Sequence, residues 1–135
     1  MTQRNKFKVF AYSFLLIIAI IGLVFIWQTN AARGRDYQRL GDLKLVQQEL
    51  ADYFYEFNTY RISGCNPPAA VDSCTGAGDR RINLGQIIDP LNSRGYQYRL
   101  ISLSDDDFEI EFALETSVAG LAPGAHSYTK NGLKQ

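Results

Sequence analysis

Residues 8–27 of the chain read KVFAYSFLLIIAIIGLVFIW, and the stretch from Val9 to Trp27 carries no charged side chain. About 20 apolar residues in a helix span the hydrocarbon core of a bilayer, whereas the apolar region of a cleaved secretory signal has about 7–15 residues. The length therefore favours a retained transmembrane helix, with the Trp27 ring at the water interface. A weak cleavage site lies near Ala31, so a secreted domain released from this segment is the alternative.

Positive charge flanks this segment almost equally on its two sides. Basic side chains precede it at Arg4, Lys6 and Lys8 and follow it at Arg33, Arg35 and Arg39. Lys and Arg are normally more frequent on the cytoplasmic side of a span, but here their numbers on the two sides are nearly equal. Residues 1–8 form only a short tail, and a disulfide in the C-terminal part of the chain would place that part outside the cytoplasm. We therefore expect a single-pass protein of the inner (cytoplasmic) membrane. Its N-terminus is expected in the cytoplasm and its C-terminal domain outside.

Two cysteines, Cys65 and Cys74, bracket the stretch CNPPAAVDSC, which is rich in residues typical of loops. Two cysteines this close in a loop are able to close a small disulfide, and disulfides persist in oxidising compartments. A pair of free thiols is the alternative. A zinc site is not expected, because two cysteines and the distant His126 do not complete the usual tetrahedral ligand set.

An apolar stripe follows the hydrophobic segment. Its members are Leu43, Val46, Leu50, Tyr53, Phe57 and Tyr60, spaced 3, 4, 3, 4 and 3 residues apart. This spacing is typical of one helix face, and charged residues such as Arg39 are expected off the stripe. No proline occurs before Cys65, so one helix of about 75 Å is predicted from Val9 to Phe57. The stripe is expected to pack on its own domain; a coiled coil with another chain, over about two and a half heptads, is the alternative.

The C-terminal residues are predicted to form a small antiparallel sheet preceded by a loop. Apolar and polar residues alternate in FEIEFALE, residues 108–115, which is typical of a strand with one buried face. Residues 95–103, GYQYRLISL, form the expected partner strand, and residues 104–107 join the two as a hairpin. One further short strand is expected around 126–129. The acidic side chains expected to face water are Glu109, Glu111 and Glu115.

These segments together predict an α+β fold. A long N-terminal helix, transmembrane in its first half and amphipathic in its second, packs on a small antiparallel β-sheet. A hairpin alone is marginally stable in water, so the sheet must pack on the amphipathic half of the helix. The predicted parts are a short cytoplasmic tail (1–8), a transmembrane helix (9–27), its amphipathic continuation (28–60) and an extracytoplasmic sheet domain with a loop (61–135).

The sequence holds no residue set typical of catalysis or of a cofactor site. Neither a GxSxG motif nor a Walker-type loop occurs. Asp105, Asp106 and Asp107 are a weak candidate calcium site, because adjacent carboxylates do not easily reach one ion and the EF-hand pattern is absent. A solvated hairpin tip is the simpler interpretation. Fourteen basic and fourteen acidic side chains balance, so we expect no nucleic-acid partner. Because the sequence shows no catalytic residue set, we also expect no enzyme.

Several short motifs follow one another along the chain, and their order is more specific than any one of them. Within the apolar segment they are Ile18, Ala19, Ile20, Ile21 and Gly22. Beyond it they are Arg35-Asp36, Arg39, Asp42-Leu43, Leu50, Tyr53, Asn58, Tyr60, Asp89-Pro90, Tyr96 and Tyr98. In this order the chain resembles type IV pilins and the pseudopilins of type II secretion systems, above all the short major-pseudopilin type. The resemblance implies a structural membrane protein whose N-terminal helix packs with the lipid bilayer and with other pilin or pseudopilin subunits.

Two positions near the N-terminus depart from the pattern of that family. Lys8 stands where the family has the glycine of its cleavage site, and Ser13 stands where it has a glutamate. In the family, this glutamate is thought to pair with the N-terminal amine of the neighbouring subunit, which satisfies a charge in lipid. Because a prepilin peptidase needs the glycine that Lys8 replaces, we expect no cleavage by this peptidase. An uncleaved, membrane-anchored extracytoplasmic binding module, which keeps the pilin-like fold but forms no filament, is the alternative function.

Overall fold

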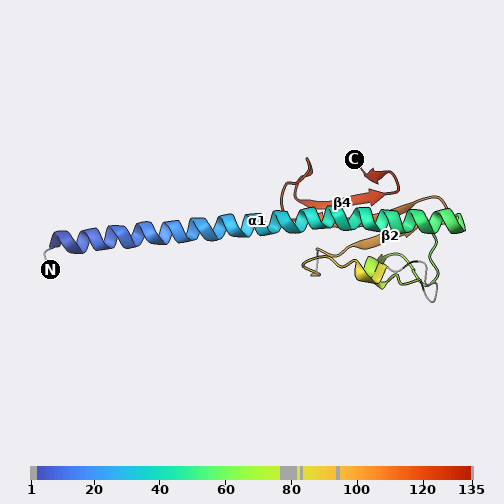
Figure 1. Cartoon of the computed structure of the whole chain (residues 1–135), viewed down its shortest axis with the longest axis horizontal. Coiled ribbons are helices and arrows are strands. Elements are labelled where there is room, and N and C mark those ends of the chain that lie inside the picture. The colour runs from blue at the N-terminus through green and yellow to red at the C-terminus, as the bar shows by residue number, and fades with distance from the viewer. Residues whose placement is uncertain (1–2, 77–81, 83, 94, 135) are drawn as a thin grey trace.

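The computed structural model describes residues 3–76, 82, 84–93 and 95–134. The chain begins with one long helix, α1 (Gln3–Phe57), which runs along the whole length of the molecule (Figure 1). Its 55 residues correspond to a length of about 82 Å at 1.5 Å per residue. The predicted continuous helix is confirmed, and it begins upstream of its predicted start, within the stretch expected to be a short tail.

The helix ends where Asn58 takes a left-handed backbone conformation, with φ at 54°. Asparagine tolerates this conformation better than most other residues with a side chain, and it often ends helices for that reason. The Asn58 N–H donates to the Phe54 carbonyl at 2.7 Å. The helix therefore ends at Phe57, as predicted, whereas the part 28–60 assigned to its continuation is too long at its C-terminal end. Tyr60 reaches the core from the segment that follows the helix.

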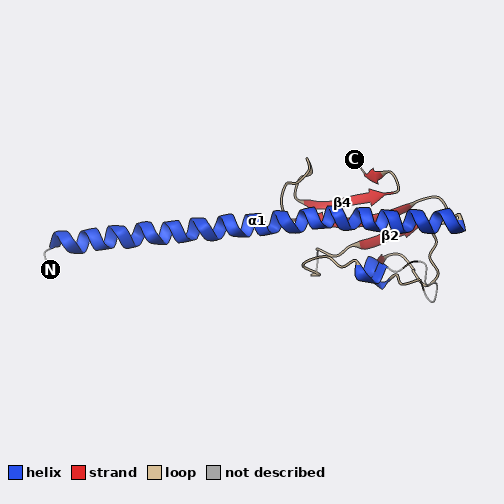
Figure 2. Ribbon diagram, in the orientation of Figure 1, coloured by secondary structure: helices blue, strands red, loops and turns tan. Residues whose placement is uncertain are grey.

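A five-stranded antiparallel sheet packs along the C-terminal half of α1, while the N-terminal half extends away from it (Figure 2). The strands are β1 (Ala69–Ala70), β2 (Arg99–Leu103), β3 (Phe108–Leu114), β4 (Gly124–Thr129) and β5 (Gly132–Leu133), arranged in this order. Two short 3-10 helices, η1 (Val71–Ser73) and η2 (Leu84–Gln86), lie between β1 and β2 in the chain. The fold is thus α+β, as predicted.

The hairpin predicted at the centre of the sheet is present. Strands β2 and β3 are antiparallel, with Leu103 opposite Phe108 and residues 104–107 as the connection. β2 begins at Arg99, four residues later than predicted. The strand expected around 126–129 is β4, which pairs with the other edge of β3. The outer strands β1 and β5 are not predicted from the sequence, because two residues are too few to show an alternating pattern.

The core lies between α1 and the inner face of the sheet. The helix contributes Leu43, Val46 and Leu50, each 0% exposed, and Tyr53, 7% exposed. The buried residues of β3 are Phe108, Ile110, Phe112 and Leu114. The helical spacing of the stripe and the two-residue period of β3 therefore both correspond to buried faces.

Phe57 is the exception on the predicted stripe, because 38% of it is exposed. The chain turns at Asn58, so Tyr60 fills the end of the core instead. The Tyr60 ring meets Phe108 edge-on, with ring centroids 5.2 Å apart. Phe57 packs on Tyr53 at the end of the helix, with centroids 4.6 Å apart.

Cys65 and Cys74 form a disulfide, and their Cα atoms lie 4.9 Å apart. Both cysteines are buried, and Val71 between them belongs to the same hydrophobic core. The disulfide therefore ties the segment that carries β1 and η1 to the core, in a part of the domain where regular secondary structure is sparse.

Candidate functional site

The N-terminal half of α1 presents a bare apolar surface. From Tyr12 to Trp27, its large apolar side chains are each about half to three-quarters exposed. By length and composition, the helix is able to cross a membrane. The predicted anchor residues Ile18, Ala19, Ile20, Ile21 and Gly22 all lie on this exposed segment.

Just beyond the apolar segment, a group of charged side chains joins the helix to the sheet domain. We call it the charge cluster: Arg35, Asp36, Arg39, Asp89 and Glu115. Arg39 donates to both carboxylate oxygens of Asp89 (Nε at 2.6 Å, Nη2 at 3.1 Å), and its Nη1 donates to Asp36 and to Glu115, both at 2.7 Å. Arg35 donates through Nε and Nη2 to Glu115, at 2.8 and 2.5 Å. One guanidinium therefore connects carboxylates from the helix, the loop before β2 and the end of β3.

The carboxylates of the cluster also bind backbone groups. Asp36 accepts the N–H groups of Glu115 (3.0 Å) and Thr116 (2.8 Å), directly after β3, and the Thr116 hydroxyl at 2.7 Å. Asp89 accepts the N–H of Leu91 at 2.8 Å. Among the residues that the structure describes, no buried side-chain nitrogen or oxygen lacks a hydrogen-bond partner. The buried polar atoms of the cluster therefore all have hydrogen-bond partners within the described chain.

The hydrogen bonds of Asp36, Glu115 and Arg39 shift the pKa values of these groups against the effect of burial. Burial alone would raise the pKa of Asp36, but hydrogen bonds from Glu115, Thr116 and Arg39 bring that pKa below its ordinary value. The hydrogen bond from Arg35 is the main reason why the pKa of Glu115 is lowered, against the effect of burial. Burial would lower the pKa of Arg39, but its carboxylate partners raise it. These groups therefore stay ionised at neutral pH, as a structural ion network requires.

The position of the cluster on the helix follows from the same spacing as the apolar stripe. Asp36 and Arg39 lie seven and four residues before Leu43, so they continue the stripe toward the N-terminus. The expectation that Arg39 lies off the stripe is wrong, because its side chain is 0% exposed. The expectation that Glu115 faces water is also wrong, since its side chain is only 15% exposed. The helical spacing alone would have placed Asp36 and Arg39 on the buried face. The prediction missed this because charged residues are usually found at the protein surface.

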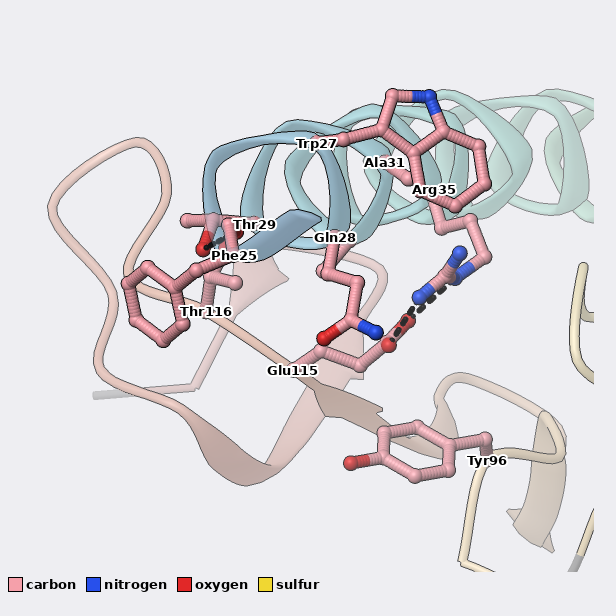
Figure 3. A pocket seen from close by; sticks show the side chains of 10 residues that line it. Phe25, Trp27, Gln28, Thr29, Ala31, Arg35, Tyr96, Glu115 and Thr116 are labelled. Carbon is pink, nitrogen blue, oxygen red and sulfur yellow. Dashed lines mark hydrogen bonds and ion pairs between the residues drawn. The ribbon is translucent and has the colours of Figure 1, made fainter. Parts of the chain in front are cut away.

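A cleft of about 520 Å³ opens between α1 and the sheet domain, on the side of the charge cluster that faces the apolar segment (Figure 3). Its polar lining comes from Gln28, Thr29 and Arg35 on the helix and from Tyr96, Glu115 and Thr116 on the domain. The Tyr96 ring also contacts the charge cluster, because the Arg39 guanidinium carbon lies 4.8 Å from its centroid. The cleft therefore borders the bare helix on one side and the ion network on the other.

The three carboxylates considered for calcium take part in the hairpin between β2 and β3. Asp105 pairs with Arg61 at 3.0 Å, Asp106 accepts the Ser104 hydroxyl at 3.1 Å, and Asp107 accepts the backbone N–H of the next residue at 2.9 Å. Within the part of the chain that the structure describes, no three His, Cys, Asp or Glu side chains are grouped so as to hold a metal ion. The geometry corresponds to a hydrogen-bonded turn.

No protein-family model, curated protein or solved structure matches the chain. Two features of the molecule carry functional information. The bare apolar half of α1 is long and apolar enough to cross a membrane. The charge cluster, with the cleft beside it, fixes the sheet domain at the end of that surface.

Proposed function

We propose that the chain is a single-pass, membrane-anchored structural protein with a pilin-like fold, related in role to the pseudopilins that work with type IV pilus or type II secretion machinery. The observation that carries the proposal is the division of one unbroken helix. Its first half is apolar and bare, and its second half is buried against a small sheet domain. A helix of this kind holds a domain at a fixed height above a membrane and offers its apolar half to lipid and to neighbouring subunits.

The charge cluster supports this role mechanically. A salt bridge at the protein surface contributes little, whereas Arg39 is buried and each of its carboxylate partners belongs to a different part of the chain. Helix and sheet are therefore joined at the point where the helix leaves the apolar segment. A force or displacement on the anchor passes directly to the domain, which is what a structural subunit needs.

The disulfide supports the proposed orientation. Disulfides persist in oxidising compartments and are rare in the reducing cytosol. A domain that holds Cys65 and Cys74 as a disulfide is suited to the extracytoplasmic side of the inner membrane. The N-terminus then lies in the cytoplasm.

A second candidate function is an anchored extracytoplasmic binding module that forms no filament. Lys8 and Ser13 favour it, because they replace the residues by which the pilin family is processed and registered. Ser13 lies on the bare part of α1 and carries no charge with which to pair a neighbour's amine. The two candidates share the anchor and differ in whether copies of α1 contact one another.

Cysteine cross-linking in cell membranes tests the proposal. The two native cysteines are already paired, so an added thiol reports on its own surroundings. Ile21→Cys lies on the bare apolar segment, and Asn131→Cys, in the turn after β4, is the exposed control. The structural role predicts oxidative dimers for Ile21→Cys and none for Asn131→Cys.

Monomers at both positions, at native expression level, would instead support the binding module. The intact mass of the purified protein adds an independent result. A chain that begins upstream of Val9 is expected, whereas a terminus near Ala31 would mean a secreted domain and exclude both candidates.

A further inference from the structure

The cleft lies at a depth that can be worked out from the helix. Val9 to Trp27 is 19 residues, which rise about 28 Å, close to the roughly 30 Å core of a bilayer. The polar headgroup layer adds about 5–8 Å on each side, or roughly four or five residues of helix. Gln28 and Thr29, which line the cleft, therefore fall within the headgroup layer of the leaflet on the domain's side.

Arg35 lies further along the helix, yet its charged group reaches back toward the same layer. Side chains on a helix tilt toward its N-terminus, which here is the membrane side. Figure 3 shows the Arg35 guanidinium extending toward Glu115, in the opening that Gln28 and Tyr96 also face. Long cationic side chains near the end of a span commonly reach the interface in this way.

The cleft offers both signs of charge side by side. Arg35 binds Glu115 through Nε and Nη2, so its Nη1 group is the one that a phosphate would reach. Glu115 suits an ammonium group by its charge, and the Tyr96 ring, which the Arg39 guanidinium contacts on one face, borders the same opening. Gln28 contributes an amide that both donates and accepts. Phe25, which also lines the cleft and is 70% exposed, lies on the acyl-chain side.

From this arrangement we propose that the cleft binds the headgroup of a zwitterionic phospholipid, with the phosphate at Arg35 and the ammonium group between Glu115 and Tyr96. The proposal rests on the membrane anchoring in the proposed function. An anionic headgroup is the poorer fit, because the carboxylate of Glu115 cancels the charge of Arg35. The volume of about 520 Å³ is within the range of small-molecule sites, roughly 300–1,000 Å³.

Native mass spectrometry of the full-length protein in detergent tests the proposal. The probe is dioleoylphosphatidylethanolamine, titrated in parallel with dioleoylphosphatidylglycerol. One retained phosphatidylethanolamine per chain is expected. Arg35→Gln should weaken its retention about tenfold, the effect of losing a hydrogen bond to a charged group. The matched control is Arg33→Gln, an exposed arginine that does not line the cleft, which should change retention by less than about twofold.

A second variant covers the case in which Arg35→Gln disturbs the ion network. Ala31→Phe fills the cleft from the helix and removes no hydrogen bond, and it should also abolish retention of the lipid. Equal losses for Arg33→Gln and Arg35→Gln, or retention of phosphatidylglycerol as strong as that of phosphatidylethanolamine, would overturn the proposal. So would full competition by glycerophosphoethanolamine, which has the headgroup without acyl chains, because the site would then recognise a soluble phosphoester.

Alkaline carbonate extraction of membranes separates this proposal from the anchoring on which it rests. A chain that stays in the membrane pellet but retains no phosphatidylethanolamine refutes the headgroup site alone. A chain that carbonate releases refutes the anchor, and the headgroup site with it.

Discussion

Replacing Arg39 by methionine should be one of the most damaging single substitutions in this protein. The side chain is 0% exposed, and its guanidinium donates four hydrogen bonds to the carboxylates of Asp36, Asp89 and Glu115. Because methionine fills a similar volume, the expected loss of stability comes from removing the positive charge. Removing one partner of a buried ion network costs about 3–5 kcal/mol, because the remaining charges stay buried without compensation. The whole domain is expected to have only about 5–15 kcal/mol of stability.

Urea unfolding of the full-length protein in detergent, followed by the near-ultraviolet circular dichroism of its tyrosines, measures this loss. Arg61→Met is the matched control, because Arg61 also pairs with an aspartate at 3.0 Å, but both side chains are mostly exposed. An exposed pair contributes about 0–1 kcal/mol, so the control should unfold close to the wild type. A loss below about 1 kcal/mol for Arg39→Met would refute the view that the network holds the helix to the sheet.

The effect of pH gives a second check on the same substitution. In the wild type, the folded-state pKa values of Asp36 and Glu115 lie below their ordinary values. Their contribution to stability is therefore present above the unfolded-state pKa values and is lost as pH falls through the folded-state values. In Arg39→Met much of this contribution is already missing, and acid relieves the repulsion between the remaining carboxylates. The stability difference between variant and wild type should thus shrink from about pH 7 to about pH 4, and a constant difference would contradict the electrostatic explanation.

Three further predictions concern the domain itself, each measured as a shift of the urea midpoint. Replacing Cys65 and Cys74 together by serine should cost about 2.5 kcal/mol, the loop-closure entropy expected for cysteines nine residues apart. Leu50→Ala should cost about 2–5 kcal/mol, because the side chain is 0% exposed. Its matched control is Leu45→Ala, at a side chain that is 54% exposed, which should cost less than about 1 kcal/mol. Tyr98→Phe should cost about 1–3 kcal/mol, because its hydroxyl donates at 2.8 Å to a carboxylate on α1 that would lose this donor.

The long helix and the central hairpin were predictable because each has a pattern repeated over many residues. Leu43, Val46 and Leu50 recur at helical spacing, and β3 alternates buried and half-buried residues along its whole length. Such repetition lets packing on one face decide the structure. The edge strands β1 and β5 have two residues each, so their place depends on their partner strands and on the turns beside them, which no local pattern encodes.

The charge cluster was harder to predict for a different reason. Asp36 and Arg39 occupy positions of the buried stripe, but their residue types are typical of the surface. They are buried together because Asp89 and Glu115, 50 and 76 residues away from Arg39, complete the network. The resemblance to the pilin family singled out Asp36, Arg39 and Asp89 as a motif without giving them a role. A sequence read segment by segment does not pair groups so far apart.

Two glycines, Gly34 and Gly41, lie on the outer face of α1. Gly34 and Gly41 lie two helical turns apart, both exposed, and an added Cβ at either would meet no atom within 4 Å outside the helix itself. Glycine in a helix costs about 0.5–1 kcal/mol relative to alanine. In the described part of the chain, no close packing at either glycine offsets this cost. Small residues on a helix do allow a second helix to approach closely, which is the kind of contact that the proposed structural role requires.

Substituting both glycines by alanine therefore has two separable consequences. The free energy of unfolding of the detergent-solubilised chain, measured by urea, should rise by about 0.5–1 kcal/mol for each site, because alanine is the better helix former. Lys44→Ala, at an exposed helix position that already carries a side chain, should change stability by less than about 0.5 kcal/mol. If copies of α1 meet along this face, the same double variant should weaken a cross-link through Leu23→Cys in membranes even though each molecule is more stable, because Leu23 lies eleven residues, about three helical turns, before Gly34 and so on the same face. A cross-link of unchanged yield would place the contact elsewhere on the helix. A fall in the stability of the double variant would mean that the added methyl groups meet neighbouring atoms, contrary to the 4 Å of open space at both glycines.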